Sequence, residues 1–247
     1  MAALLILALL LVAAWSAVYR KGDDAARAAT AGPLLLFTSL PIYWAEAPDL
    51  AATLNDTGET HWARRAIEAS RALRPLDTLG TATLGRAHDL LMAQPRPLSP
   101  DENVALDAWV AGGGHLLLFA DPALTAQSAF ALGDRRRPQD LVLLSPILAR
   151  WGLRLEFDAG QAPGEHSVAL GDGVAIAVNL PGRFVVVPGG RQDSSCRLGA
   201  KALMAECRIG RGKIFALADA ALFEPTPDAM SEAERRTALG SLLRRAF

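Results

Sequence analysis

Residues 99–122 read SPDENVALDAWVAGGGHLLLFADP, and this stretch decides the fold class. Ser99 and Glu102 form a capping box, the pairing that begins a helix with its first backbone N–H groups satisfied. The triple glycine at 112–114 ends that helix, and one of these glycines is expected in the left-handed conformation that follows a helix. His115 to Ala120 is then an apolar run, which is typical of a strand buried on both faces.

Apolar runs that predict further buried strands flank this stretch on both sides; they are Leu34–Thr38, Asp89–Ala93 and Lys213–Ala218. The sequence also predicts a helix over 59–73, a short strand over 75–79 and a helix over 144–151. Ser231 and Glu234 form a second capping box, which predicts a closing helix to Arg245. Strands that alternate with helices indicate an α/β fold whose mainly parallel sheet carries helices on both faces.

A β-rich region interrupts this alternation between about residues 155 and 209. Its short β runs are punctuated by Gly, Pro and Asp, which indicates hairpins. We therefore expect an antiparallel insertion or extension beside the parallel sheet.

The N-terminal residues predict one transmembrane helix. Ala2 to Tyr19 contains no charged residue, and its 18 residues would span about 27 Å as a helix, close to the bilayer core. The alternative is a cleaved signal peptide with a small-residue site at 12–14, although no basic residue precedes the apolar run. Residues 20–32 are interpreted as a linker, and the domain begins at Pro33.

Composition excludes several classes of protein. Twenty-five Lys and Arg against 26 Asp and Glu give a net charge of −1, which argues against a general nucleic-acid binder. Two cysteines are too few for a disulfide scaffold or a zinc ribbon. No nucleotide or metal motif is present, and the histidines lack ligand spacing, so we expect no cofactor and no metal. The four histidines are His61, His88, His115 and His166.

Three polar residues directly follow predicted buried strands: Ser39, Asp121 and Asp219. Parallel sheets place ligands at the carboxyl ends of their strands. We therefore expect these residues at the same end of adjacent strands, with the two aspartates facing one crevice, and treat all three as candidates for ligand or partner binding. The alternative is that the aspartates only cap the segments that follow them.

Cys196 and Cys207 are a candidate disulfide. If the chain turns so that Ala200 lies opposite Leu203, the two cysteines become cross-strand partners within disulfide reach. The alternative is two buried free thiols. A disulfide requires an oxidising compartment and favours a periplasmic domain, whereas Arg20 and Lys21 after the apolar run favour a cytoplasmic one.

Residues 34–41, 98–122 and 210–224, taken in order, resemble the class I glutamine amidotransferase-like domains of membrane-anchored bacterial auxiliary proteins. The GldG-type component of ABC transport systems and its relatives of unknown function form the group that they are most similar to. The resemblance covers 33–125 and 205–247. It implies a flavodoxin-like sheet, an inner-membrane tether, a periplasmic domain and service to an integral-membrane transporter or envelope complex.

One departure from the amidotransferases bears on function. Those enzymes carry a Cys at a strand-to-helix elbow and a downstream His-x-Glu, whereas this chain has Asp121-Pro122 after its predicted strand and no His-x-Glu. The resemblance therefore suggests a non-catalytic, membrane-tethered binding or scaffolding module. The alternative hypothesis is a hydrolase that uses Asp121 and Asp219.

Overall fold

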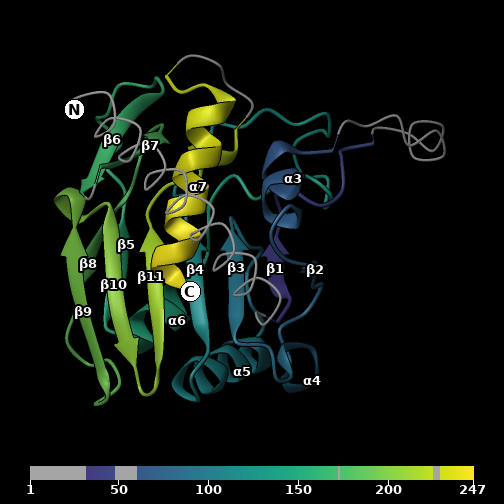
Figure 1. Ribbon diagram of the computed structural model, residues 1–247. Coiled ribbons are helices and arrows are strands. Elements are labelled where there is room, and N and C mark those ends of the chain that lie inside the picture. The colour runs from purple at the N-terminus through teal and green to yellow at the C-terminus, as the bar shows by residue number, and fades with distance from the viewer. Residues whose placement is uncertain (1–31, 48–59, 172, 225–228) are drawn as a thin grey trace, which may run out of the picture.

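The chain folds around one central sheet of seven strands. The computed structural model of the chain describes residues 32–47, 60–171, 173–224 and 229–247. The strand order is β2-β1-β3-β4-β11-β10-β9 (Figure 1). The first five of these strands are mutually parallel, and β10 and β9 extend the sheet in antiparallel fashion. The expected α/β class with a mainly parallel sheet is confirmed.

The parallel strands are short and almost wholly apolar. Their bounds are β1 Leu34–Thr38, β2 Leu73–Pro75, β3 Asp89–Ala93, β4 His115–Phe119 and β11 Gly212–Leu217. Helices α3 (Trp62–Glu68) and α7 (Glu232–Ala246) lie on one face of the sheet, with α5 (Pro100–Ala111) and α6 (Ser145–Arg150) on the other (Figure 1). Because both faces are covered, the strands read as continuous apolar runs and not as alternating ones.

Both predicted capping boxes are present. Ser99 Oγ accepts the Glu102 N–H at the start of α5, and Ser231 Oγ accepts the Glu234 N–H at the start of α7. Gly113 follows α5 with a φ of 119°, the left-handed conformation expected within the triple glycine.

The stretch between α3 and β3 differs from the prediction. The helix expected over 59–73 ends at Glu68, and the strand expected over 75–79 is Leu73–Pro75. Leu73 fits the helical spacing of the preceding apolar residues, yet its burial comes from parallel pairing with Leu34. A short helix, α4 (Thr81–Leu84), leads into β3.

The β-rich region divides between three sheets. Two antiparallel pairs form separate two-stranded sheets: β5 (Leu153–Glu156) with β8 (Arg183–Val186), and the hairpin of β6 (His166–Gly171) with β7 (Val174–Val178). The remaining strands, β9 (Ser194–Gly199) and β10 (Met204–Ile209), join the central sheet beside β11. The region is thus partly an insertion and partly an extension. Two 3₁₀ turns, Ala200–Ala202 and Ala221–Phe223, complete the elements.

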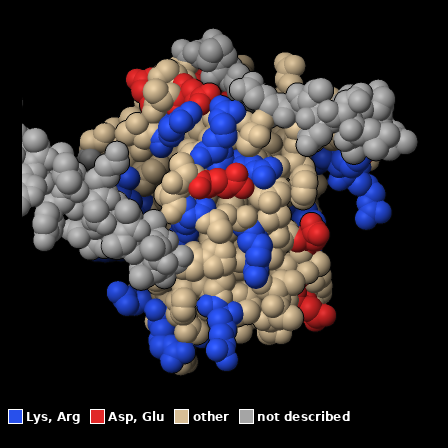
Figure 2. All heavy atoms as spheres, turned by 45° about the vertical axis from the view of Figure 1, so that its right-hand side comes forward, with Lys and Arg blue, Asp and Glu red and all other residues tan. Residues whose placement is uncertain are grey.

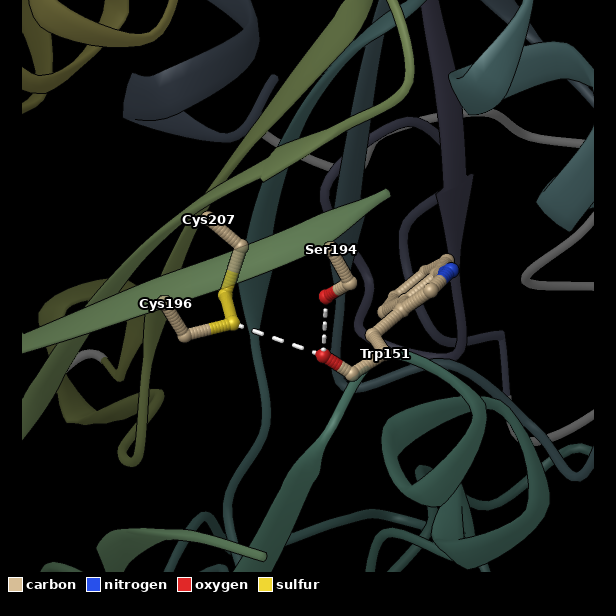
Figure 3. The surroundings of a disulfide bond; sticks show 4 residues. All are labelled: Trp151, Ser194, Cys196 and Cys207. Carbon is tan, nitrogen blue, oxygen red and sulfur yellow. Dashed lines mark hydrogen bonds between the residues drawn. A yellow bond between two sulfur atoms is a disulfide. The ribbon is translucent and has the colours of Figure 1, made fainter. Parts of the chain in front are cut away.

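A disulfide joins β9 to β10. Cys196 and Cys207 are register partners, in the register that the sequence predicts, and their sulfurs are bonded. The bridge packs beside the end of α6, where the Trp151 carbonyl accepts a hydrogen bond from Ser194 Oγ at 2.6 Å (Figure 3). Cys196 Sγ lies 3.5 Å from the same oxygen. The bond therefore links the outer strands of the sheet next to a fully buried tryptophan.

The predicted transmembrane segment, Ala2–Tyr19, and most of the linker lie outside the described residues. Among the residues that the structure describes, none of the helices has the length and apolar character needed to cross a bilayer.

Candidate functional site

The carboxyl end of the sheet brings two of the three predicted site residues together. Asp121 follows β4 and Asp219 follows β11, and these strands are parallel neighbours that pair Phe119 with Leu217. Ser39 follows β1 at the same end, but β3 lies between β1 and β4. The expectation of one shared end is correct, and the expectation that all three strands are adjacent is wrong.

Asp121 is wholly buried and its carboxylate is fully used by the backbone. Its Oδ1 accepts the Ala123 N–H at 2.8 Å, and its Oδ2 accepts the Ala220 N–H at 3.0 Å. The side chain has 0% exposure. Asp121 therefore caps the turn after β4. It also binds the N–H of Ala220, the residue directly after Asp219.

Asp219 is held in the same way. Its Oδ1 accepts the Ala221 N–H at 2.7 Å, and its Oδ2 accepts the Asn179 N–H at 2.9 Å, with 2% of the residue exposed. The two aspartates therefore lie side by side but do not face an open crevice. The expected crevice is closed because backbone N–H groups, which stabilise buried carboxylates, approach both side chains.

A third buried acid completes this cluster. Glu224 accepts hydrogen bonds from the Thr125 N–H at 3.2 Å and from Thr125 Oγ1 at 2.9 Å. Asn179 Nδ2 in turn donates to Thr125 Oγ1 at 2.9 Å. The sequence reasoning missed Glu224, although it is a polar residue that ends the apolar run 220–223.

Burial governs the acidity of the cluster. The pKa of Asp121 is raised to about 7, chiefly by burial and to a smaller extent by the nearby Glu224 carboxylate, while the two backbone hydrogen bonds act to lower it. Burial also raises the pKa of Asp219 well above its ordinary value, and repulsion from Asp121 adds to this. The pKa of Glu224 is raised by burial as well. The cluster therefore retains protons at pH values where an exposed carboxyl is ionised.

Ser39 takes part in a second buried network at the point where the strand order reverses, between β1 and β3. Its hydroxyl donates to the Gln94 carbonyl at 2.5 Å and accepts the Gln139 N–H at 3.0 Å. The buried Gln94 amide then accepts the Asp121 N–H at 2.9 Å and donates to the Asp121 carbonyl at 3.0 Å. Open α/β sheets bind ligands at such a reversal; here the side chain of Gln94 and the segment at Gln139 occupy it.

A buried ion pair fixes the loops beside the cluster. Arg235 and Glu165 are in contact at 2.5 Å, with side chains only 3% and 2% exposed. Arg235 also donates to the carbonyls of Ala221, Leu222 and Met230. The sequence reasoning missed this pair because 70 residues separate its members.

A groove of about 700 Å³ lies between residues 78–81 and the part of α5 that runs from its start to Ala108. Arg96 and Glu102 line it and are in contact at 2.7 Å, and this hydrogen bond is the main cause that lowers the pKa of Glu102 to about 2. Val104 and Ala108 give the groove apolar walls. The charges of Arg96 and Glu102 thus neutralise one another.

The described residues contain no group of three side chains that could hold a metal ion. His61 caps α3, where its Nδ1 accepts the Ala63 N–H at 3.1 Å. His115 Nδ1 lies 3.2 Å from Asp89 Oδ1, at the opposite end of the sheet from the acid cluster. These two histidines have structural contacts.

Comparison with known proteins finds similar chains among solved structures alone. No family model matches the chain, and no curated protein matches it. Solved structures with similar folds include a ThuA-like protein from Bacteroides uniformis ATCC 8492, with 12% identity over 88% of this chain and 89% of the other, at a TM-score of 0.45. The cytoplasmic protein STM1381 from Salmonella typhimurium LT2 has 8% identity over 87% and 99%, at 0.46.

The exo-β-1,4-mannosidase Op5Man5 from an Opitutaceae bacterium has 14% identity over 88% of this chain, at a TM-score of 0.46. The chain spans only 36% of that enzyme. At this identity the likeness carries no activity or substrate to the present chain. What the chain shows by its own topology is a mixed α/β domain with a mainly parallel central sheet.

Proposed function

We propose that this chain is a non-catalytic, membrane-tethered binding or scaffolding module that serves an ABC-type transporter or an envelope-associated ATPase system. One observation carries the non-catalytic part. The carboxyl end of the sheet, where α/β proteins present reactive groups, holds two aspartates with every carboxylate oxygen engaged by a backbone N–H.

The amidotransferase-like resemblance supports the same reading. The residue that follows β4 is Asp121, and it is followed by Pro122 in place of a Cys elbow. A nucleophile must reach its substrate and be activated by a neighbouring base. Asp121 is buried, and its described hydrogen-bond donors are backbone N–H groups. The order of the parallel strands, numbered along the chain as 2-1-3-4-5, agrees with the flavodoxin-like sheet that the resemblance implies.

The proposed location is the inner membrane, with a single N-terminal span and a periplasmic domain. The uncharged run Ala2–Tyr19 supports the span. The disulfide between Cys196 and Cys207 supports an oxidising compartment, against the basic residues Arg20 and Lys21.

Membrane extraction tests the tether. Full-length protein is expected to stay with the membrane after an alkaline carbonate wash, whereas a truncated chain that begins at Gly32 is released. Release of the full-length protein would contradict a spanning helix. Thiol labelling of denatured, unreduced protein tests the compartment: Cys196 and Cys207 should remain unlabelled, and complete labelling of both would indicate a reducing location.

Purification of the full-length protein from native membranes tests the binding role. We expect a specific ABC permease or ATPase subunit to co-purify in fixed ratio, and to be absent when the truncated chain is used as bait. If no transporter or envelope ATPase subunit co-purifies with the full-length protein, that result would count against the proposal.

A second candidate function, hydrolysis, rests on the pKa of Asp121, which is raised to about 7 and would suit a general acid. Asp121→Asn and Asp219→Asn test it on ester, amide and glycoside substrates. The scaffold proposal expects no turnover above background in wild type or variants. Turnover by the wild type that both variants lose, while remaining folded, would replace the proposal with the hydrolase.

A further inference from the structure

The amino end of the central sheet differs in charge from the carboxyl end. We propose that this end of the sheet is a docking surface for an anionic lipid bilayer. The inference rests on the proposed membrane tether and adds an orientation to it: the domain lies with the amino ends of its parallel strands against the membrane.

Neighbouring strands bring basic residues together at this end. Arg208 on β10 is the register partner of Lys213 on β11, and Lys213 is the register partner of His115 on β4. Side chains two residues apart on a strand share a face. Phe215 lies under Arg245 of α7, so Lys213 and Arg208 lie on the α7 face as well.

Turns and the end of α7 add to this surface. Arg211 lies in the turn between β10 and β11, where its guanidinium donates to the Gly112 carbonyl at 2.9 Å. Arg244 lies in the last turn of α7, and Arg86 lies just before β3. We call Arg86, Arg208, Arg211, Lys213 and Arg244 the basic rim.

The acidic side chains nearby are already paired. Asp89 contacts Arg71 at 2.8 Å and His115 at 3.2 Å. Glu206 contacts Arg245 at 2.7 Å. Among the described residues, no member of the basic rim has an ion pair with an acidic side chain. Figure 2 shows basic side chains projecting from the lower margin of the molecule, which is this end of the sheet.

The course of the chain identifies the partner as a lipid surface. Gly32 and Pro33 enter β1 at this same end, and Arg71 donates to the Gly32 carbonyl at 2.7 Å. Thirteen residues, 20–32, separate the predicted span from the domain. Fully extended they reach at most about 45 Å. Gly32 is thus held within that distance of the bilayer, at the same end of the sheet as the basic rim, and short tethers strongly favour a second contact.

The local positive charge and the short tether together favour a lipid surface over nucleic acid as the partner. The chain as a whole has a net charge of −1, so its positive charge is local. A basic residue close to an anionic membrane strengthens binding by about fivefold, so several residues give a firm contact even when each is weak. Exposed arginines without acidic partners retain their full charge for the phosphate groups of such lipids.

Full-length protein in lipid nanodiscs provides the test. Hydrogen–deuterium exchange is compared in discs of phosphatidylglycerol and in discs of phosphatidylcholine. We expect amides of residues 208–213 and 240–247 to exchange at least about fivefold more slowly in the anionic discs, and high salt to remove this protection. Equal exchange in the two lipids would overturn the docking surface.

Two matched variants make the test specific. Replacing Arg208, Arg211, Lys213 and Arg244 with Gln should abolish the protection. The control replaces Arg135, Arg136, Arg154 and Arg183 with Gln; these arginines are exposed elsewhere on the domain, and the change in net charge is equal. Protection lost equally in both variants would show a general charge effect and overturn the assigned surface, as would protection of 208–213 by an oligonucleotide and not by anionic lipid.

Flotation separates this inference from the tether. Full-length protein should float with vesicles of either lipid, because the span inserts regardless of headgroup. Flotation with both lipids but equal exchange would overturn only the docking surface. Flotation with phosphatidylglycerol alone would contradict the tether and support the docking surface, and flotation with neither lipid would overturn both.

Discussion

The two ends of the central sheet carry charged residues of opposite sign in opposite environments. At the carboxyl end, Asp121, Asp219 and Glu224 are buried, and their oxygens accept hydrogen bonds from neighbouring loops. At the amino end, the basic rim is in contact with water and has no acidic partner among the described residues. Parallel sheets usually carry a ligand site at the carboxyl ends of their strands. Here the polar side chains at that end bind backbone groups of the neighbouring loops and stabilise the fold.

Loop length accounts for the difference. The segments after β4 and β11 are irregular and turn back over the sheet, so their backbone N–H groups need acceptors. Carboxylates at strand ends supply them. The turns at the amino end are tight: Gly113 after α5 and Gly210 between β10 and β11 both adopt positive φ. Such turns leave few N–H groups to satisfy, and side chains there remain available to a partner.

The largest expected effect comes from the buried ion pair at the carboxyl end. Arg235→Ala leaves Glu165 buried without its partner and should lower the free energy of unfolding by about 3–5 kcal/mol. Urea denaturation measures this. Arg236→Ala, at the next position of the same helix and exposed, should change stability by less than about 0.5 kcal/mol. If both variants lose the same free energy of unfolding, the buried ion pair does not stabilise the carboxyl end more than an exposed one does.

Removal of the disulfide should cost somewhat less. Cys196→Ser with Cys207→Ser opens a loop of about 12 residues, for which the chain-entropy treatment gives about 3 kcal/mol. Denaturation midpoints with and without a reducing agent check this prediction. The reductant should destabilise the wild type to the level of the double variant and leave the variant unchanged; an unaffected wild type would show that the bond does not constrain the sheet.

The acid cluster should make stability depend on pH. Burial raises the pKa of Asp121 to about 7, so the folded chain binds more protons than the unfolded chain, in which an Asp titrates near 3.9. The free energy of unfolding contributed by this group is therefore greatest below about pH 4 and falls as pH rises toward about 7. Asp121→Asn should reduce that fall by roughly 1–3 kcal/mol.

Denaturation at about pH 5 and about pH 8 measures this difference. Asp134→Asn is the control, since hydrogen bonds from Arg136 lower the pKa of Asp134 to about 2 and leave it ionised across the range. Its pH dependence should match that of the wild type. If Asp121→Asn leaves the pH dependence of the free energy of unfolding unchanged, the cluster does not retain its protons.

The smallest expected effect lies at the amino end. Arg208→Gln and Arg244→Gln should each alter the free energy of unfolding by less than about 0.5 kcal/mol, because neither side chain has a described ion pair to lose. Thermal unfolding of the purified protein checks this. A loss of more than about 1 kcal/mol would assign these residues to the fold and weaken the contrast between the two ends.

Local patterns in the sequence predicted much of the fold. The capping boxes at Ser99 and Ser231 and the apolar run at 115–120 predicted elements that the structure contains, because caps and buried strands depend on residues close in sequence. The register of Cys196 with Cys207 follows from a turn of a few residues. The prediction was wrong where one pattern fits two structures, as at Leu73, whose burial depends on a distant strand.

By itself, the sequence determined the fold class, the places of Asp121 and Asp219 after their strands and the register that makes Cys196 and Cys207 a candidate pair, because each follows from spacing along a few turns or strands. Only the tertiary structure decided which strands are neighbours, and so placed β3 between Ser39 and Asp121. It also decided that Glu224 and the pair Arg235–Glu165 close the carboxyl end, since their partners lie 70 to 99 residues away. Burial and hydrogen bonding at such separations depend on loop paths, which no local pattern encodes.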